Sequence, residues 1–228
     1  MKVSSEFSKY ANKYDEYSII QDKVAKKLLS MVKDEPKYIL DLGCGSGRLS
    51  KDITWKYEKL LGIDFALGMI DIHPRAKNIE CMYGDFNDSA LFRDKLSKYN
   101  FDYILSASAL QWSDDIEKTF KDIKSLNSSV ALAIFTSNTF STLYKTASLK
   151  PLLPTKEKVY ELQKRYFNIN FEIVEYKLKF NNVRDMFKYI KRSGVSGSRN
   201  ILTFKQMKKL MDEYPLDYLE FEVVFVSS

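Results

Sequence analysis

The sequence Asp41-Leu-Gly43-Cys-Gly45-Ser-Gly47 stands between an apolar run, YILDLG at 38–43, and a segment with helical character. Three glycines in five residues let the backbone bend sharply and approach a ligand with no side chain in the way. The helix that follows presents free N–H groups at its start. The stretch therefore predicts a ligand site between a strand and a helix.

Segments of strand and helix character alternate around this turn. Helices at this spacing between strands predict βαβ units, and so a doubly wound, mostly parallel α/β sheet of the Rossmann-like kind. Such a sheet binds its ligand at the carboxyl ends of the strands. The predicted strands are 38–43, 59–64, 78–85, 101–110 and 129–137, and the predicted helices are 47–57, 66–73, 88–98 and 114–126.

The flanking regions complete a single domain over 1–228. Apolar spacing predicts one N-terminal helix over 6–33, ended by Glu35-Pro36 because a residue before proline resists helix. The segment 138–165 fits the sheet least well, and together with 182–200 it is predicted to form a helical lid or cap over the site. The last third is predicted to contain strands at 171–180 and 219–226, a helix at 182–193 and another that starts at Thr203.

Composition narrows the classes of function. No apolar stretch is long enough for a membrane span or a signal peptide, so a cytoplasmic protein is expected. The two cysteines, Cys44 and Cys81, form no CxxC pair, and His73 is the one histidine. A disulfide framework and a metal site are therefore not expected. Cys44 is interpreted as a small residue filling the turn, and His73 as a surface residue beside Pro74.

Positive charge is concentrated in the last third. Residues 145–210 hold 16 Lys and Arg against 5 Asp and Glu, whereas the whole chain carries a net charge of +6. A solvated lysine-rich surface is one interpretation. The other is a field that steers an acidic partner toward the protein.

The glycine spacing is informative about the ligand. The dinucleotide fingerprint is GxGxxG, whereas this chain has GxGxG followed by Arg48. Asp41 would repel a pyrophosphate but suits an amino or sulfonium cation. The pattern resembles motif I of the class I S-adenosylmethionine-dependent methyltransferases. A tight turn that binds nothing is the alternative.

Two later carboxylates agree with that resemblance. Asp64 ends the second predicted strand, where a carboxylate can accept hydrogen bonds from both hydroxyls of a ribose. Asp85 ends the third strand beside Phe86, at the position that in this family holds the adenine amino group. The resemblance thus implies S-adenosylmethionine as cofactor, bound by the three glycines, Phe86 and the three aspartates.

Sequences outside these motifs resemble a narrower family, the malonyl-[acyl-carrier-protein] O-methyltransferases of biotin synthesis. The resemblance covers almost the whole chain. It is carried by FSKYANKYDEYSIIQDKVAKKLL at the start, SASALQW at 106–112, and IKRSGVSGSRN followed by ILTFKQMKKL near the end. It implies methyl transfer to the free carboxylate of a malonyl thioester on an acidic acyl carrier protein, giving the methyl ester that primes pimeloyl formation.

This chemistry suits a chain with one histidine. A carboxylate has a pKa of roughly 4 and needs no general base at neutral pH, so catalysis consists mostly of positioning. The resemblance implies positioning roles near the site for Tyr10, Tyr14, Gln111 and Trp112.

Basic residues are expected to hold the malonyl substrate. The resemblance favours Lys191 and Arg199, which match charged positions of the family. Lys188 and Arg192 lie with Arg184 on the same polar face of the 182–193 helix. For each of them a solvated surface charge is the alternative.

Three other functions stay open. Another small-molecule methyltransferase would share the whole cofactor half. A tRNA or rRNA methyltransferase would use the basic third of the chain, but neither an RNA-binding motif nor an NPPY-type sequence supports a nucleic-acid partner. A protein that binds S-adenosylmethionine without turnover is the third.

Overall fold

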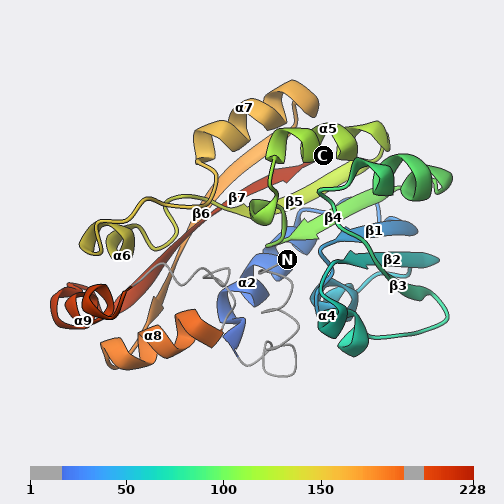
Figure 1. The fold of residues 1–228 in the computed structure, drawn as a ribbon. Helices are drawn as coiled ribbons and strands as arrows, with labels where there is room; N and C mark the ends of the chain where they lie inside the picture. The colour runs from blue at the N-terminus through green and yellow to red at the C-terminus, as the bar shows by residue number, and fades with distance from the viewer. Residues whose placement is uncertain (1–16, 193–202) are drawn as a thin grey trace.

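The computed structural model describes residues 17–192 and 203–228, which form one seven-stranded sheet with helices on both faces (Figure 1). In chain order the strands are β1 (Tyr38–Leu42), β2 (Lys59–Asp64), β3 (Ile79–Tyr83), β4 (Tyr103–Ala107), β5 (Ser129–Phe135), β6 (Asn170–Lys179) and β7 (Tyr218–Ser227). Their order across the sheet is β3-β2-β1-β4-β5-β7-β6.

The first five strands are parallel to one another, whereas β7 is antiparallel to both β5 and β6. The central strands are buried on both faces, which explains why they are continuous apolar runs without alternation. Every residue of β1 after Tyr38 is buried, for example. The predicted doubly wound, mostly parallel α/β sheet is confirmed.

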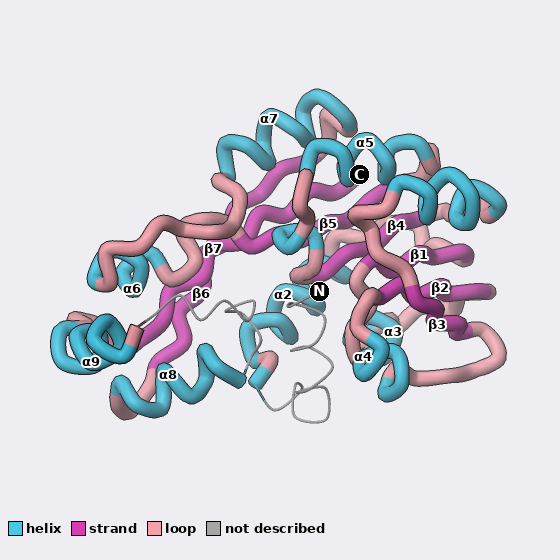
Figure 2. Tube along the Cα trace, viewed as in Figure 1, coloured by secondary structure: helices cyan, strands magenta, loops and turns pink. Residues whose placement is uncertain are grey.

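Two apolar cores lie on opposite faces of the sheet. One packs α2 against β4 and β5, and the other packs α5 and α7 against the far face (Figure 2). None of the helices in the part of the chain described is long and apolar enough to cross a membrane. The helices are α2 (Ile19–Ser30), α3 (Arg48–Asp52), α4 (Leu67–Ile72), α5 (Ile116–Ser125), α6 (Ser141–Thr146), α7 (Lys156–Tyr166), α8 (Val183–Arg192) and α9 (Phe204–Glu213).

The helix predicted over 47–57 is too long. In the structure α3 ends at Asp52, and Ile53 is extended, with φ −64° and ψ 124°. The indole of Trp55 donates a hydrogen bond of 3.1 Å to the carbonyl of Pro36. That bond holds the following loop against the start of β1 instead of continuing the helix.

Two other helix predictions are also corrected. The segment 88–98 forms a π-helical turn, η2 (Leu91–Lys95), and a 3-10 turn, η3 (Leu96–Lys98). There the Ser97 hydroxyl donates to the carbonyl of Arg93, a local bond that competes with the backbone ladder. The N-terminal helix is interrupted at Ser18 and ends at Ser30, before Asp34 and Glu35 adopt positive φ. Residues 6–16 of that prediction lie outside the described residues.

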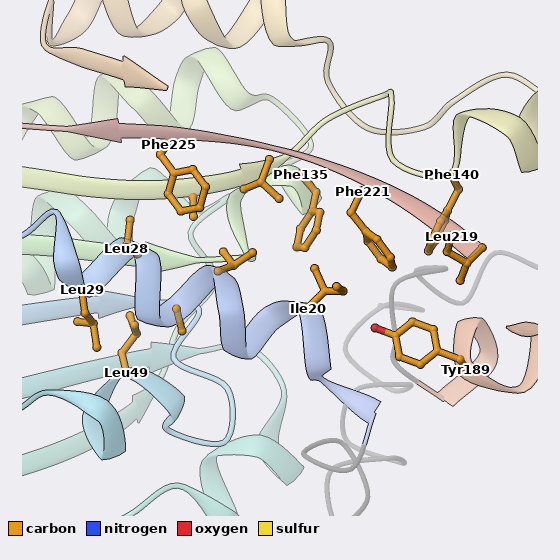
Figure 3. Close-up of a cluster of buried hydrophobic side chains, with 14 of the residues drawn as sticks. Ile20, Leu28, Leu29, Leu49, Phe135, Phe140, Tyr189, Leu219, Phe221 and Phe225 are labelled. Carbon is orange, nitrogen blue, oxygen red and sulfur yellow. The ribbon is translucent and has the colours of Figure 1, made fainter. Parts of the chain in front are cut away.

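The helices near the ends of β6 and β7 share the main core. Figure 3 shows Tyr189 of α8 facing Ile20 of α2 and Phe221 of β7, and the Tyr189 and Phe221 ring centroids lie 6.4 Å apart. Phe140, just before α6, packs its ring 5.0 Å from that of Phe221. Within 138–165, α7 packs on the sheet through Val159. The cap role of 138–165 and 182–200 stays a prediction.

Candidate functional site

A cleft opens at the carboxyl ends of β1, β2 and β4. The alternation of strands and helices in the sequence predicts a ligand at this edge of the sheet. The cleft encloses about 440 Å³ of empty space, a volume that includes open solvent at its mouth. Its walls combine a bare backbone turn, one carboxylate and several apolar side chains. The lining residues are Gly43, Gly45, Asp64, Phe65, Met69, Phe86, Ala107, Ser108, Ala109 and Trp112.

Two glycines of the turn have different surroundings. Both adopt positive φ, +76° at Gly43 and +52° at Gly45, a conformation that side chains disfavour. A Cβ on Gly43 would lie 2.2 Å from the Cβ of Ala109, so the missing side chain lets the turn pack on the end of β4. A Cβ on Gly45 would meet no atom within 4 Å. Gly43 thus closes the turn, and Gly45 faces open space.

Asp64 connects this turn to the end of β2. Its Oδ2 accepts a hydrogen bond of 2.8 Å from the N–H of Gly45, and its Oδ1 accepts one of 2.8 Å from the N–H of Ala66. Burial raises the pKa of Asp64, although the backbone N–H groups partly offset that rise. Each carboxylate oxygen keeps a second lone pair. Asp64 can therefore hold the turn and still accept hydrogen bonds from a ligand.

Asp41 is a buried carboxyl at the end of β1. Its residue surface is 1% exposed, and neither oxygen has a hydrogen-bond partner among the described residues. Burial, with a smaller contribution from Asp64, raises its pKa to about 8. An unpaired buried polar group is costly and calls for an explanation. A cationic ligand nearby would supply one, although Asp41 itself does not line the cleft.

After β3, the ring of Phe86 lines the cleft, whereas the carboxylate of Asp85 does not. Asp85 accepts two hydrogen bonds of 2.9 Å from the backbone and side-chain nitrogens of Asn87, which close a local turn. It does not line the cleft. Phe86 is buried and does, with its ring centroid 6.4 Å from that of Phe65. The two aromatic rings and Met69 make this wall apolar.

Gln111 and Trp112 belong to a 3-10 turn, η4 (Leu110–Trp112), and face different ways. Gln111 is buried, and its Nε2 donates a hydrogen bond of 2.6 Å to the carbonyl of Ser108. Ser108 has φ +62°, so this bond supports a strained bend at the mouth of the cleft. Trp112 lines the cleft, whereas Gln111 does not.

The predicted basic residues are placed only in part. Lys188 lies on α8, 58% exposed, and pairs with Asp185 at 3.2 Å, so it is not a cleft residue in the described part of the chain. Lys191 and Arg192 end α8, but their side chains lie outside what the structure describes. Tyr10, Tyr14 and Arg199 also lie outside the described residues.

Sequence reasoning missed several cleft residues and misplaced one. Phe65 directly follows Asp64, and Ala109 lies within SASALQW. Their position beside predicted site residues could have pointed to both. Met69 gave none. His73, predicted at the surface, is 3% exposed, because the bend at Pro74 turns its ring under the glycine turn. Cys44 is buried in the turn, as expected.

Comparison with known proteins agrees with this geometry. The family model described as "Methyltransferase domain" matches residues 39–128, which include the glycine turn, Asp64 and Trp112. The match identifies these residues as a methyltransferase domain. Over its whole length, the methyltransferase is 28% identical to malonyl-[acyl-carrier protein] O-methyltransferase 2 of Ilyobacter polytropus, in an alignment that covers 100% of this chain and 94% of the relative.

Solved structures share the fold of this methyltransferase. The YcgJ protein from Bacillus subtilis superposes with a TM-score of 0.61 at 10% identity, covering 90% of this chain and 98% of that one. Haemonchus contortus phosphoethanolamine N-methyltransferase 2, in complex with S-adenosyl-L-methionine, gives a TM-score of 0.50 at 15% identity, covering 88% of this chain and 52% of that one.

The cofactor of this methyltransferase is S-adenosylmethionine. Two features of the cleft fit a group that carries an ammonium and a sulfonium. One is the carboxyl of Asp41 behind the turn, which has no hydrogen-bond partner in the part of the chain that the structure describes, and the other is the open space over Gly45.

Proposed function

We propose that this methyltransferase methylates the free carboxylate of malonyl-acyl carrier protein, giving the malonyl methyl ester. The observation that carries the proposal is the length of the similarity to the Ilyobacter enzyme of that name. It extends over 100% of this chain, well beyond the shared domain at 39–128. The last third, which distinguishes one methyltransferase from another, is therefore included.

S-adenosylmethionine supplies a methyl group on a positively charged sulfur, which a nucleophile in line with the carbon–sulfur bond displaces. A malonyl carboxylate is ionised at neutral pH, with a pKa of roughly 4, so no side chain has to remove a proton. The residues of this chain have to hold two molecules in line and keep water away. A cleft with one carboxylate and mostly apolar walls suits that task.

The cofactor is assigned to the residues of the turn and the strand ends. Gly45 leaves room for it, whereas Gly43 and Gly47 keep the turn packed, since a Cβ would lie 2.2 Å from the Cβ of Ala109 at Gly43 and 2.3 Å from the Cδ of Pro74 at Gly47. Asp64 accepts the ribose hydroxyls and Asp41 balances the cationic amino-acid end. Phe86 stacks against the base, with Asp85 at its amino group.

The acceptor is assigned to the other side of the cleft. Trp112 lies there, and the Gln111–Ser108 hydrogen bond fixes the loop that presents it. The resemblance implies that Tyr10 and Tyr14, which lie outside the described residues, also have positioning roles in the reaction. Exclusion of water by Trp112 would favour a reaction that neutralises an anion and a cation.

The substrate's carrier is assigned to the basic third of the chain. Figure 1 places α8 with α6 and α9 beyond the end of β6, on the side of the sheet where the parallel strands end. Lys188 and Lys191, with Arg192 and Arg199, would attract an acidic carrier protein and mainly raise the rate of encounter. An arginine fork suits a carboxylate or phosphate in two-point contact, which favours Arg199 for the malonyl arm.

Mass spectrometry of the acceptor tests the proposal. Malonyl-acyl carrier protein, acetyl-acyl carrier protein and malonyl-coenzyme A are each incubated with the enzyme and S-adenosylmethionine. We expect a gain of one methyl group on malonyl carrier protein and none on acetyl carrier protein, which lacks the free carboxylate. A gain on malonyl-coenzyme A at equal rate would limit the role of the carrier. No gain on any malonyl thioester would contradict the assignment.

A further inference from the structure

Three side chains that are far apart in sequence meet behind the glycine turn. Cys44 lies within the turn, His73 follows α4, and Cys81 lies on β3. All three are buried, and their ligand atoms, the two Sγ atoms and one imidazole nitrogen, lie within 4.8 Å of one another. The two Sγ atoms are 3.4 Å apart. None of the three takes part in the proposed methyl transfer.

Gly62 makes the space in which they meet. It pairs with Cys81 in the β2–β3 register, so both residues face the same side of the sheet. A Cβ on Gly62 would lie 2.8 Å from the Sγ of Cys44 and 3.4 Å from the Nε2 of His73. Any other residue at 62 would therefore displace the thiol from its place over the strand.

The His73 ring is oriented so that a nitrogen lone pair points into the cluster. Its Nδ1 lies 2.8 Å from the carbonyl oxygen of Pro74. A carbonyl only accepts hydrogen bonds, so Nδ1 carries the proton and Nε2 carries the lone pair. Nε2 is buried and has no hydrogen-bond partner among the described residues. Histidines that bind metals are commonly held in this way.

The charge around the sulfur atoms also favours a cation. The carboxyls of Asp41 and Asp64 are also buried, on the neighbouring strands β1 and β2. The same carboxyls would attract a positive ion placed between the thiols.

We propose that Cys44, Cys81 and His73 Nε2 bind one Zn²⁺ ion behind the cofactor cleft. Zn–S bonds of about 2.3 Å and Zn–N bonds of about 2.0 Å put neighbouring ligands of a tetrahedral ion about 3.5–3.8 Å apart. The sulfur atoms are already near that spacing, whereas a disulfide would need them at about 2.05 Å. Binding releases the two thiol protons, and the fourth position is left for water or another ligand.

The ion would join three elements that shape the cofactor site. Cys44 lies between Gly43 and Gly45, so zinc would hold the turn against β3 and against the end of α4. Sequence spacing gave no sign of this site, because the ligands are 29 and 8 residues apart and form no CxxC pair. Zinc binding is a property independent of methyl transfer and is measured without it.

Metal titration of the full, reduced chain tests the proposal. We expect one Zn²⁺ per chain in competition with a chelating dye, and thiolate-to-metal absorption when Co²⁺ replaces zinc. Cys81→Ser and His73→Gln should each weaken zinc binding by about 100-fold or more, because each removes a ligand. Ile70→Val is the matched control, since Ile70 packs in the same buried cluster but offers no ligand atom.

Each outcome decides the question. Circular dichroism and S-adenosylmethionine binding show whether a variant is folded, and a folded variant that loses zinc supports the site. Folded wild-type protein that takes up no zinc would overturn it, as would zinc binding that is unchanged in His73→Gln. A Cys44–Cys81 disulfide in protein isolated from cells, with no zinc uptake after reduction, would show a redox pair instead of a metal site.

Discussion

The first five strands and the last two build the same sheet by different means. From β1 to β5, short strands of 5 to 7 residues lie parallel, and the cleft forms where the first two and β4 end. In the last third, β6 and β7 are 10 residues each, pair antiparallel along their whole length, and extend to α8 and α9. The difference suggests that local turns specify the cofactor site, whereas long-range pairing positions the residues expected to select the substrate.

The glycine turn should be the most sensitive point of the first region. Gly43→Ala places a methyl group 2.2 Å from Ala109 at φ +76°. Strain and overpacking together should cost about 3–4 kcal/mol and abolish cofactor binding. Gly45→Ala is the matched control, because its methyl group meets open space and only the strain of about 1–2 kcal/mol remains. Denaturant unfolding measures the stability of both variants. Equal losses of stability would contradict the different roles of the two glycines.

Substitution of Asp64 should have the next largest effect. Asp64→Ala removes the proposed ribose acceptor and leaves the N–H groups of Gly45 and Ala66 without their partner. We expect S-adenosylmethionine affinity to fall about 100-fold, since two charge-assisted hydrogen bonds are lost. Asp85→Ala should have a smaller effect, because Asp85 is engaged with Asn87. Calorimetry that gave unchanged affinity for Asp64→Ala would place the ribose elsewhere.

A buried glutamate offers the corresponding test in the second region. Glu222 of β7 is 3% exposed, accepts hydrogen bonds from Thr136 and Asn138, and pairs with Lys156 at 3.2 Å. Glu222→Ala should reduce stability by about 2–3 kcal/mol, because it leaves buried donors unpaired. Cofactor affinity should stay within a few-fold of wild type. A large loss of affinity in folded Glu222→Ala protein would mean that the two regions are coupled.

The two buried carboxyls should respond to pH in opposite directions. Burial raises the pKa of Asp41 to about 8, so the folded ligand-free protein holds a proton that the unfolded chain releases near 3.8. Stability from Asp41 is therefore lost as pH rises from about 4 to 8. Burial alone would raise the pKa of Glu222, but hydrogen bonds lower it below its usual range, so its contribution is lost in acid.

Asp41→Asn tests the first of these. At pH 8 the ligand-free variant should be more stable than wild type by about 2 kcal/mol, a rise in Tm of about 5 °C, and the gain should shrink toward pH 5. The same variant should bind S-adenosylmethionine more weakly. A gain in stability that does not vary with pH would contradict the assignment to Asp41.

The smallest effect is expected from the substrate residues. Arg199→Ala should raise KM for malonyl carrier protein about 10-fold and leave cofactor affinity unchanged, because one charged contact is removed. Lys179→Ala, an exposed charge on β6 that is 80% exposed, is the control for general electrostatic attraction. Steady-state kinetics at two salt concentrations separate a specific contact of Arg199 from general electrostatic attraction. Equal changes in both variants would indicate steering alone.

The amino-acid sequence by itself determined the local part of this structure. The apolar run 59–64 matches β2 at both ends, and Thr203 caps α9 through a reciprocal capping box with Gln206. The glycine spacing and the acidic residues located the turn and its cofactor. These features depend on residues a few positions apart, whose φ angles, burial and hydrogen bonds the sequence encodes directly.

Tertiary structure alone decided what depends on contacts between distant residues. The insertion of β7 between β5 and β6 has no local signal, because a strand's apolar pattern shows that it is buried and not which strands it joins. The meeting of Cys44, His73 and Cys81 over Gly62, and the end of α3 held by Trp55, are of the same kind. Their physical reason is packing: each follows from which surfaces the folded chain brings within a few ångströms of one another.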